Sequence, residues 1–544
     1  MRMTGRHGPR AAGRSSRRAT QARTRVLLPA LAAALLLVAA CSATIVGQPM
    51  RASTPAVSSA TTTPSPTAST VPPTTPTTAS PTGPTTGSSE TTGPTGTGQS
   101  PTLFPTPTQS SEVPDDEVGL KPDAPTATLK VSGNAHTEAD KIAIDTLADL
   151  FDYYDATFPR DFDRTYQPPR QLVSYDSTDK KAKVCGRSAY QMVNAFFAPS
   201  CDTIAWDRGV MLPMMIKDIG QLAPAVVLSH EIGHDVQDEL GVPGSTPTIV
   251  LEQQADCYAG AYWRWVADGN SKYFNFNQTE GMRQMLLSLF QAHDPVGSSG
   301  QGENDHGNGF DRTYAATLGY TTGAVRCSQI DAAEIAQRGQ EFPFNGIPHQ
   351  YGNVDITEDV LSGIIDTVND YFTQTAPGYV APTLTTFTGE QPPPCQGYTP
   401  SYPVSYCPPT NTVSYNLSEL QRIGTPTAGW ESVNGDFSAI VLLVSRYALA
   451  AQASGNSPVT GDTAGLRALC YAGTWATWMR NPQGPQGFQL SPNDLDKAIY
   501  EIVSSPLAGS DANGQSSAAL IERVQAFDIG VTHLIPECFD FYSG

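Results

Sequence analysis

The sequence predicts a helix-rich α+β fold that occurs twice within one chain. Beyond about residue 129, long apolar segments of helical period are interspersed with a few short strand-like segments, which is typical of an α+β protein. The chain also resembles itself at an offset of about 210 residues, where residues 257–260 (CYAG) are matched by the identical residues 470–473. We therefore expect two copies of one fold, at residues 127–335 and 345–544.

The order of landmarks in the two copies predicts their elements. Each copy is expected to contain an N-terminal helix, a short strand, a cysteine pair, a long apolar helix, and a second helix near the CYAG segment. The N-terminal helices are predicted at residues 139–151 and 359–372. At 544 residues the chain is long enough for two such domains plus segments that do not fold.

The N-terminus has the features of a bacterial lipoprotein signal peptide. Residues 26–40 are apolar, follow eight Arg without an acidic residue, and end at Cys41 in the segment LVAAC. We expect residues 1–40 to be removed and Cys41 to be acylated, which would anchor the exported chain to the outer face of the cell membrane. Ordinary secretion with a chance cysteine is the alternative.

Residues 41–126 are predicted to form a disordered tether. Thr, Pro and Ser dominate this segment, and it has almost no large apolar side chains with which to build a core. A semi-extended tether of this length reaches on the order of 200 Å at most, far enough to hold a domain well away from the membrane.

The charge balance argues against a nucleic-acid partner. Without the eight Arg of residues 1–40, 25 basic residues remain against 52 acidic ones, a formal charge of −27. A chain this acidic repels phosphate backbones and anionic lipid surfaces.

The cysteines predict four disulfides. Eight cysteines remain besides Cys41, an even number in an exported and therefore oxidising setting, and no CxxC pair suggests a thiolate metal site. Since they recur in the same order in both copies, the expected pairs are Cys185–Cys201, Cys257–Cys327, Cys395–Cys407 and Cys470–Cys538.

A metal-binding motif lies in the long apolar helix of the first copy, predicted at residues 224–240. His230 and His234 are four residues apart, so both imidazoles face the same side of the helix, with Glu231 beside them. This HExxH pattern is typical of zinc sites in which the two histidines bind one ion and the glutamate acts as a general base.

A third ligand is predicted from the next helix. Glu252 and Asp256 are four residues apart and share a helix face, and Glu252 lies eighteen residues beyond His234. Two histidines and one carboxylate leave the fourth zinc position open, as catalytic sites require. We expect Glu252 to bind one Zn²⁺ per chain and Asp256 to accept the other ring N–H of His230. Exchanged roles for Glu252 and Asp256 remain open.

These residues resemble the bacterial neutral zinc metallopeptidase family, whose pattern is HExGH-x-VQ followed by a Gln-Ala-Asp-Cys helix. The resemblance implies a zincin-like metallopeptidase domain in the first copy, and Asp235 departs from the histidine common at its position. The matching points are, in order, residues 184–186, 230–237, 254–257 and 305–307, Arg312, Gly319, Tyr320, Gly323 and Cys327.

The resemblance also supplies a candidate donor to the transition state. His306 lies in a loop rich in Gly and Asn and matches a family position, so we expect it to stabilise the developing charge. A surface loop histidine is the alternative, and His293 beside Asp294 is a weaker candidate.

The second copy has lost every residue of this site. Alignment places Ser445, Arg446 and Leu449 where the first copy has His230, Glu231 and His234, and Gly465 and Leu469 where it has Glu252 and Asp256. The second copy is therefore expected to keep the fold without binding zinc. It would cover apolar surface of the first copy, form one wall of its substrate cleft, or provide a surface on which a partner docks.

Together these features predict a lipid-anchored zinc metallopeptidase that hydrolyses peptide bonds of a protein or peptide substrate, with Glu231 as general base. Two alternatives remain: an envelope-binding lipoprotein without activity, and a zinc hydrolase acting on cell-wall peptide. The intact site in one copy beside a copy that has lost it favours an enzyme.

Overall fold

The computed structural model describes residues 113–290, 292–294, 306–338, 353–427, 434–480, 490–491, 493–516, 519–532 and 535–542. The predicted signal peptide, the predicted acylation site Cys41 and most of the predicted tether lie outside these residues, as does the predicted start of the second copy at residue 345.

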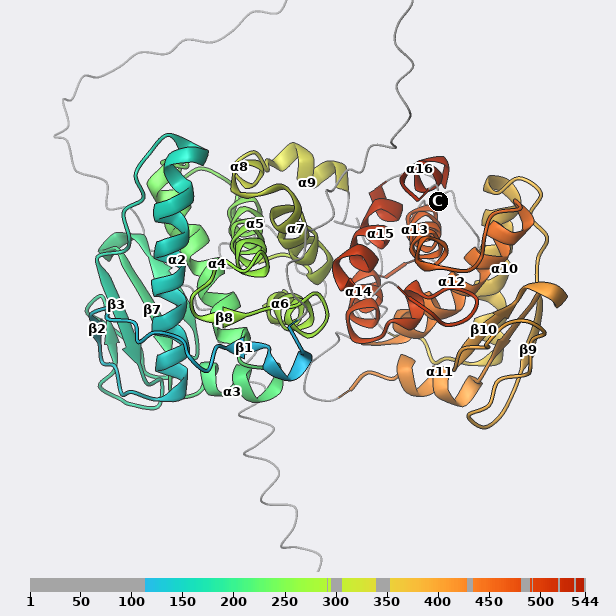
Figure 1. The fold of residues 1–544 in the computed structure, drawn as a ribbon, viewed down its shortest axis with the longest axis horizontal. Helices are drawn as coiled ribbons and strands as arrows, with labels where there is room; N and C mark the ends of the chain where they lie inside the picture. Colours follow the sequence, from blue (N-terminus) through green and yellow to red (C-terminus); the bar gives the residue numbers. More distant parts are fainter. Residues whose placement is uncertain are drawn as a thin grey trace, which may run out of the picture. The chain divides into compact units, whose positions relative to one another are not determined.

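The described chain is a helix-rich α+β protein, as predicted (Figure 1). Its first half combines one four-stranded sheet, two small two-stranded sheets, and a set of helices. Its elements are β1 Gly119–Leu120, β2 Val131–Ser132, α2 Glu138–Phe162, β3 Gln171–Tyr175, β4 Lys183–Val184, β5 Arg187–Ser188, β6 Ala195–Ala198, β7 Thr203–Asp207, α3 Met211–Asp218, α4 Ala223–Leu240, α5 Thr248–Ala267, β8 Phe274–Asn275, α6 Glu280–Phe290, α7 Gly309–Thr322, α8 Ala324–Cys327 and α9 Ala332–Arg338.

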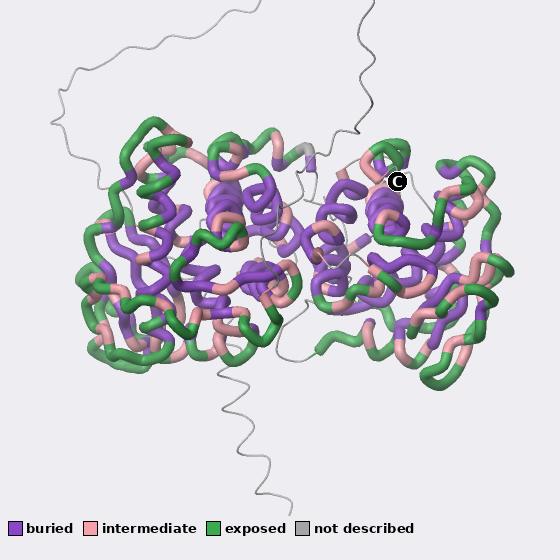
Figure 2. Tube along the Cα trace, viewed as in Figure 1, coloured by how far each residue is buried: buried purple, intermediate pink, exposed green. Residues whose placement is uncertain are grey.

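The four-stranded sheet lies against the helices that carry the metal motif. Its strand order is β2-β3-β7-β6, with β3 parallel to β7 and β6 antiparallel to β7 at the edge. Helix α4 packs against β6, α2 and α5, and α5 packs against α7. Both α4 and α5 are buried along most of their length (Figure 2), and the buried residues include polar side chains such as His230 and Asp256.

The folded part begins earlier than the predicted boundary at residue 127. Strand β1 pairs antiparallel with β8, and the side chain of Asn277 donates to the carbonyl of Val113 and to Asp115. Residues 113–126 are therefore part of the first half rather than of a disordered tether. Composition did not reveal this, because a two-residue strand acquires its hydrogen bonds from a partner more than 150 residues away.

Helix α2 is longer than the predicted residues 139–151. It begins after the N-cap Thr137, whose side chain accepts from the N–H of Asp140, and continues to Phe162. Pro159 lies in its last turn, and Asp163 ends it in the left-handed conformation with φ 54°. Aromatic side chains of the C-terminal turns pack against Tyr166, which extends the buried face beyond the predicted end.

The second half repeats the order of elements of the first. Its sheet has the order β10-β11-β9, with β9 parallel to β11 and β10 antiparallel to β11, which is the pairing of β3, β7 and β6. Its elements are α10 Glu358–Thr375, β9 Thr383–Thr386, β10 Val404–Cys407, β11 Thr412–Tyr415, α11 Leu417–Gly424, α12 Asp436–Ser454, α13 Asp462–Met479, α14 Asp494–Ser504, α15 Leu520–Thr532 and α16 Ile535–Phe541.

The four disulfides join the predicted cysteine pairs. Cys257–Cys327 links α5 to α8 across 70 residues, and Cys470–Cys538 links α13 to α16 across 68. In each half a glycine lets a later helix, α7 or α15, pack against the first cysteine of the pair: a Cβ on Gly319 or Gly530 would collide with the carbonyl of Cys257 or Cys470. The two halves therefore share this close helix packing.

Helix α12 is the one helix of the described residues that is long and apolar enough to cross a membrane. However, 89% of its apolar window is buried inside the structure. Its composition is that of a core helix of the second half, in the place that α4 holds in the first.

Candidate metal centre

Helix α4 presents His230 and His234 on one face, one turn apart. The helix ends at Gly241, which caps it with φ 72°. The two imidazole rings lie 4.8 Å apart, nearly perpendicular. His230 is buried and His234 half-buried, so the pair lies at the margin of the core, where a ligand can reach it.

Helix α5 brings the carboxylate of Glu252 against both rings. Its oxygens lie 3.3 Å from Nε2 of His230 and 3.5 Å from Nε2 of His234. The helices approach this closely because Gly233 has no side chain: a Cβ there would lie 2.7 Å from the Cα of Ala255. The glycine inside the HExxH motif is thus explained by helix packing.

The Nδ1 atom of each ring already has a hydrogen-bond partner. Nδ1 of His230 lies 2.6 Å from Asp256, and Nδ1 of His234 lies 3.0 Å from Oε1 of Gln237. Acceptors at Nδ1 keep a proton there, so Nε2 is the nitrogen of each ring that a metal ion would bind. Asp256 also accepts from Nη2 of Arg312 at 2.8 Å, so its carboxylate contacts both Arg312 and His230.

Two separations between the candidate ligand atoms match those around a tetrahedral zinc ion. Tetrahedral bonds of 2.0–2.2 Å place neighbouring ligand atoms about 3.4 Å apart, close to the two separations in this structure. His230, His234 and Glu252 form the one cluster of three potential ligands found among the described residues, with all ligand atoms within 4.8 Å. The geometry favours Glu252 over Asp256 as the third ligand, because Asp256 is occupied by His230 and Arg312.

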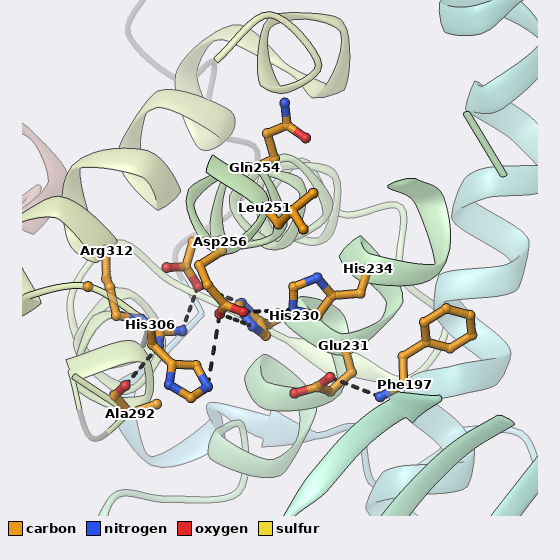
Figure 3. Close-up of polar contacts among 12 residues, drawn as sticks. Phe197, His230, Glu231, His234, Leu251, Gln254, Asp256, Ala292, His306 and Arg312 are labelled. Atoms are coloured by element: carbon orange, nitrogen blue, oxygen red, sulfur yellow. Dashed lines mark hydrogen bonds and ion pairs between the residues drawn. The ribbon is translucent and has the colours of Figure 1, made fainter. Parts of the chain in front are cut away.

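One carboxylate oxygen of Glu231 is held by the edge strand of the sheet. Its Oε2 accepts from the backbone N–H of Phe197 in β6 at 3.0 Å (Figure 3). The side chain is half-buried. It therefore lies between the metal motif and the sheet edge, with a backbone bond that fixes one of its two oxygens.

His306 lies beside Glu252, just before α7. Its Nε2 is 4.0 Å from Oε2 of Glu252, and its Nδ1 is 3.8 Å from Asp294, which also accepts the N–H groups of His306 and Gly307. His293 instead has its Nδ1 bonded to the carbonyl of Asp294 and its ring beside Phe290. The structure thus brings His306, and not His293, to the candidate ligands.

The carboxylates and imidazoles of the site shift one another's pKa values toward the charged forms. Burial disfavours a charged His230, yet Asp256 and Glu252 raise the pKa of its imidazole to about 10. Burial likewise disfavours ionised Glu252, but attraction to His306, His234 and His230 lowers its pKa. Glu252 is consequently an anion, the form that binds a metal cation.

Asp235, which departs from the family's histidine, faces the core. The hydroxyl of Tyr166 donates to its Oδ2 at 2.5 Å, and burial raises the pKa of Asp235 to about 8. Its side chain lies among buried aromatic rings, so this position has no direct access to the candidate metal ligands or to solvent.

Residues 113–282 match the model of the family described as "Putative neutral zinc metallopeptidase". The resemblance predicted from the sequence is confirmed. Family similarity supports a peptidase function. Two Escherichia coli proteins named Uncharacterized protein YpfJ, from strains K12 and O6:H1, are each 28% identical over 152 residues, which cover 25% of this chain and 51% of theirs. The chain thus matches about half the length of these curated relatives. No solved structure matches it.

Sequence reasoning assigned no role to two residues of the site. Gln237 holds His234. This contact could have been predicted, because residues three apart on a helix are neighbours. Arg312 holds Asp256 across 56 residues, and no local pattern could reveal that pair.

Replacing Asp256 by asparagine is expected to weaken zinc binding about 10- to 100-fold, the usual effect of removing the charged acceptor behind a ligand histidine. Competition with a chelator measures the dissociation constant. Asp149→Asn is the matched control, because Asp149 is also buried in the first half but bonds Tyr262 and not a ligand. Equal zinc affinity in the two variants would contradict this role of Asp256.

Proposed function

We propose that the chain is an exported zinc metallopeptidase, with His230, His234 and Glu252 as metal ligands. The observation that carries this proposal is the convergence of both Nε2 atoms on one ionised carboxylate, with each Nδ1 already bonded. Glu231 directly follows His230 in the sequence, and His306 lies close to Glu252.

Bound zinc would lower the pKa of a water molecule and polarise the carbonyl of the scissile peptide. Glu231 accepts a proton from the water molecule while the oxygen of that water bonds to the carbonyl carbon of the peptide. The carbon–nitrogen bond then breaks, and Glu231 returns the proton to the leaving amine. The imidazole of His306 donates to the carbonyl oxygen, where negative charge develops.

The second half fits a degenerate copy that binds no metal. Gln237 and Gln452 make the same contact, each donating to a backbone carbonyl of the next helix, Leu251 or Ala464. With this register, Arg446 stands where Glu231 does. Its buried guanidinium donates to carbonyls of the segment between α14 and α15, namely Leu507, Ser510 and Asp511.

The test of the proposed function is the zinc content of the purified mature chain with its disulfides formed. We expect one zinc per chain in the wild type, none in His230→Ala, and cleavage of a peptide library by the zinc-loaded wild type. Zinc without peptide cleavage would favour the cell-wall peptide or the binding lipoprotein, and cleavage of isolated cell-wall peptide would separate these two. Absence of zinc would refute the ligand assignment.

We also propose that acylated Cys41 anchors the chain to the membrane. This rests on the sequence alone: small residues precede a cysteine at the end of an apolar export signal. Cys41→Ser is expected to move the protein from the membrane fraction to the medium and to abolish labelling by radioactive palmitate. A membrane-bound, unlabelled wild type would contradict the lipid anchor.

A further inference from the structure

The second half supplies a hydrogen-bond acceptor to a helix of the first half. Asp496, in the first turn of α14, accepts the backbone N–H of Phe310 at 2.8 Å in a buried contact. It also accepts the N–H of Gly309. These two residues begin α7, where N–H groups have no partner within the helix. A carboxylate at this end accepts hydrogen bonds from these N–H groups, and its negative charge interacts favourably with the positive end of the helix dipole.

The contact has a counterpart in the opposite direction. The N–H of Leu520, the first residue of α15, donates to the carbonyl of Gln278, just before α6. Counting from Cys327 and Cys538, Leu520 of the second half corresponds to Gly309 of the first. Each half thus satisfies the start of the same helix in the other, which indicates a specific pairing of α6 and α7 with α14 and α15.

The start of α7 is joined to the candidate ligands by two routes. His306, three residues before the helix, lies 4.0 Å from Glu252. Arg312, in the first turn of α7, bonds Asp256, which bonds His230. A shift at the start of α7 would therefore reach both a ligand carboxylate and the group that orients a ligand histidine.

The first half satisfies this helix end only in part. The N-cap Asn308 accepts the N–H of Asp311, one residue beyond the two that Asp496 accepts. Both Gly309 and Phe310 are buried, so loss of Asp496 would leave their N–H groups without water as a substitute. The helix could recover these bonds only by moving or fraying.

We propose that Asp496 is a positioning residue that holds the start of α7, and through it His306 and Arg312, against the metal centre. The half that has lost its own site thereby helps to shape the intact one. This inference rests on the proposed function for its effect on zinc, while the contact of Asp496 with α7 can be tested without metal.

The test compares Asp496→Ala and Asp496→Asn with Asp511→Ala in the full mature chain. Asp511 is a matched control, because it is a buried aspartate of the second half that accepts the N–H groups of Gly461, Asn513 and Gln515, all in its own half. Asparagine keeps one accepting oxygen without the charge, so it should show a smaller effect than alanine. It also serves as the folded variant if alanine fails to fold.

Two measurements are needed: amide hydrogen exchange of residues 306–312 without metal, and the zinc dissociation constant by chelator competition. In Asp496→Ala we expect these amides to exchange about 10- to 100-fold faster and the zinc dissociation constant to rise about tenfold. Asp511→Ala should change neither.

Unchanged amide exchange at residues 306–312 in both Asp496 variants would contradict the claim that Asp496 holds the start of α7. Faster exchange with unchanged zinc affinity would overturn its link to the metal centre, and equal effects of Asp511→Ala would reduce Asp496 to a general stabilising role. If the wild type bound no zinc, the proposed function would fail, yet the exchange result would still decide whether Asp496 holds α7.

Discussion

Replacing Glu231 by glutamine is expected to lower the turnover of a cleaved peptide by about 10²- to 10⁴-fold, the usual contribution of a general base. Glutamine has nearly the same shape, but it cannot accept the proton of the attacking water. The amide oxygen can still accept the N–H of Phe197, so the local fold should persist. Zinc content should remain at one per chain, because Glu231 is not among the three clustered ligands.

Steady-state kinetics and zinc analysis on the same preparations check this expectation. Glu239→Gln is a suitable control, because Glu239 lies on the same helix in its last turn, away from the three ligands. Full activity of Glu231→Gln would remove Glu231 from the reaction. Loss of zinc together with activity would show that Glu231 acts in binding the metal, and not as a base.

Replacing Arg446 by alanine is expected to reduce the free energy of unfolding by about 3–5 kcal/mol, since several buried partners lose their donor at once. The guanidinium is fully buried and donates to three backbone carbonyls and to the hydroxyls of Ser445 and Ser510. Burial lowers the pKa of Arg446 to about 10, so it is still charged at neutral pH. Chemical denaturation followed by tryptophan fluorescence measures the loss.

Arg422→Ala provides the comparison, because that side chain is exposed and pairs only with Glu419 at the surface. Its loss should cost less than about 1 kcal/mol. Zinc content should be unchanged in both variants while the chain is folded. If Arg446→Ala were as stable as Arg422→Ala, the buried hydrogen bonds of Arg446 would not make the expected contribution to stability.

Part of the site follows from local spacing. His230 and His234 share a face because four residues make about one helical turn, and Gln237 lies within reach of His234 for the same reason. The disulfide pairs were predictable because the repeat gave each cysteine a counterpart in the same order. The fold boundary was not predictable in this way, since β1 depends on β8 for its hydrogen bonds.

The sequence by itself determined the two helices that carry the candidate site, the order of the repeated elements, and the residues from which the site is built. Only the tertiary structure decided which carboxylate faces the Nε2 atoms, that Arg312 holds Asp256, and that Asp496 reaches α7. The physical reason is the range of the interactions. Position around one helix is set by backbone bonds four residues apart, whereas contacts between helices depend on how closely distant segments pack, as at Gly233 against Ala255.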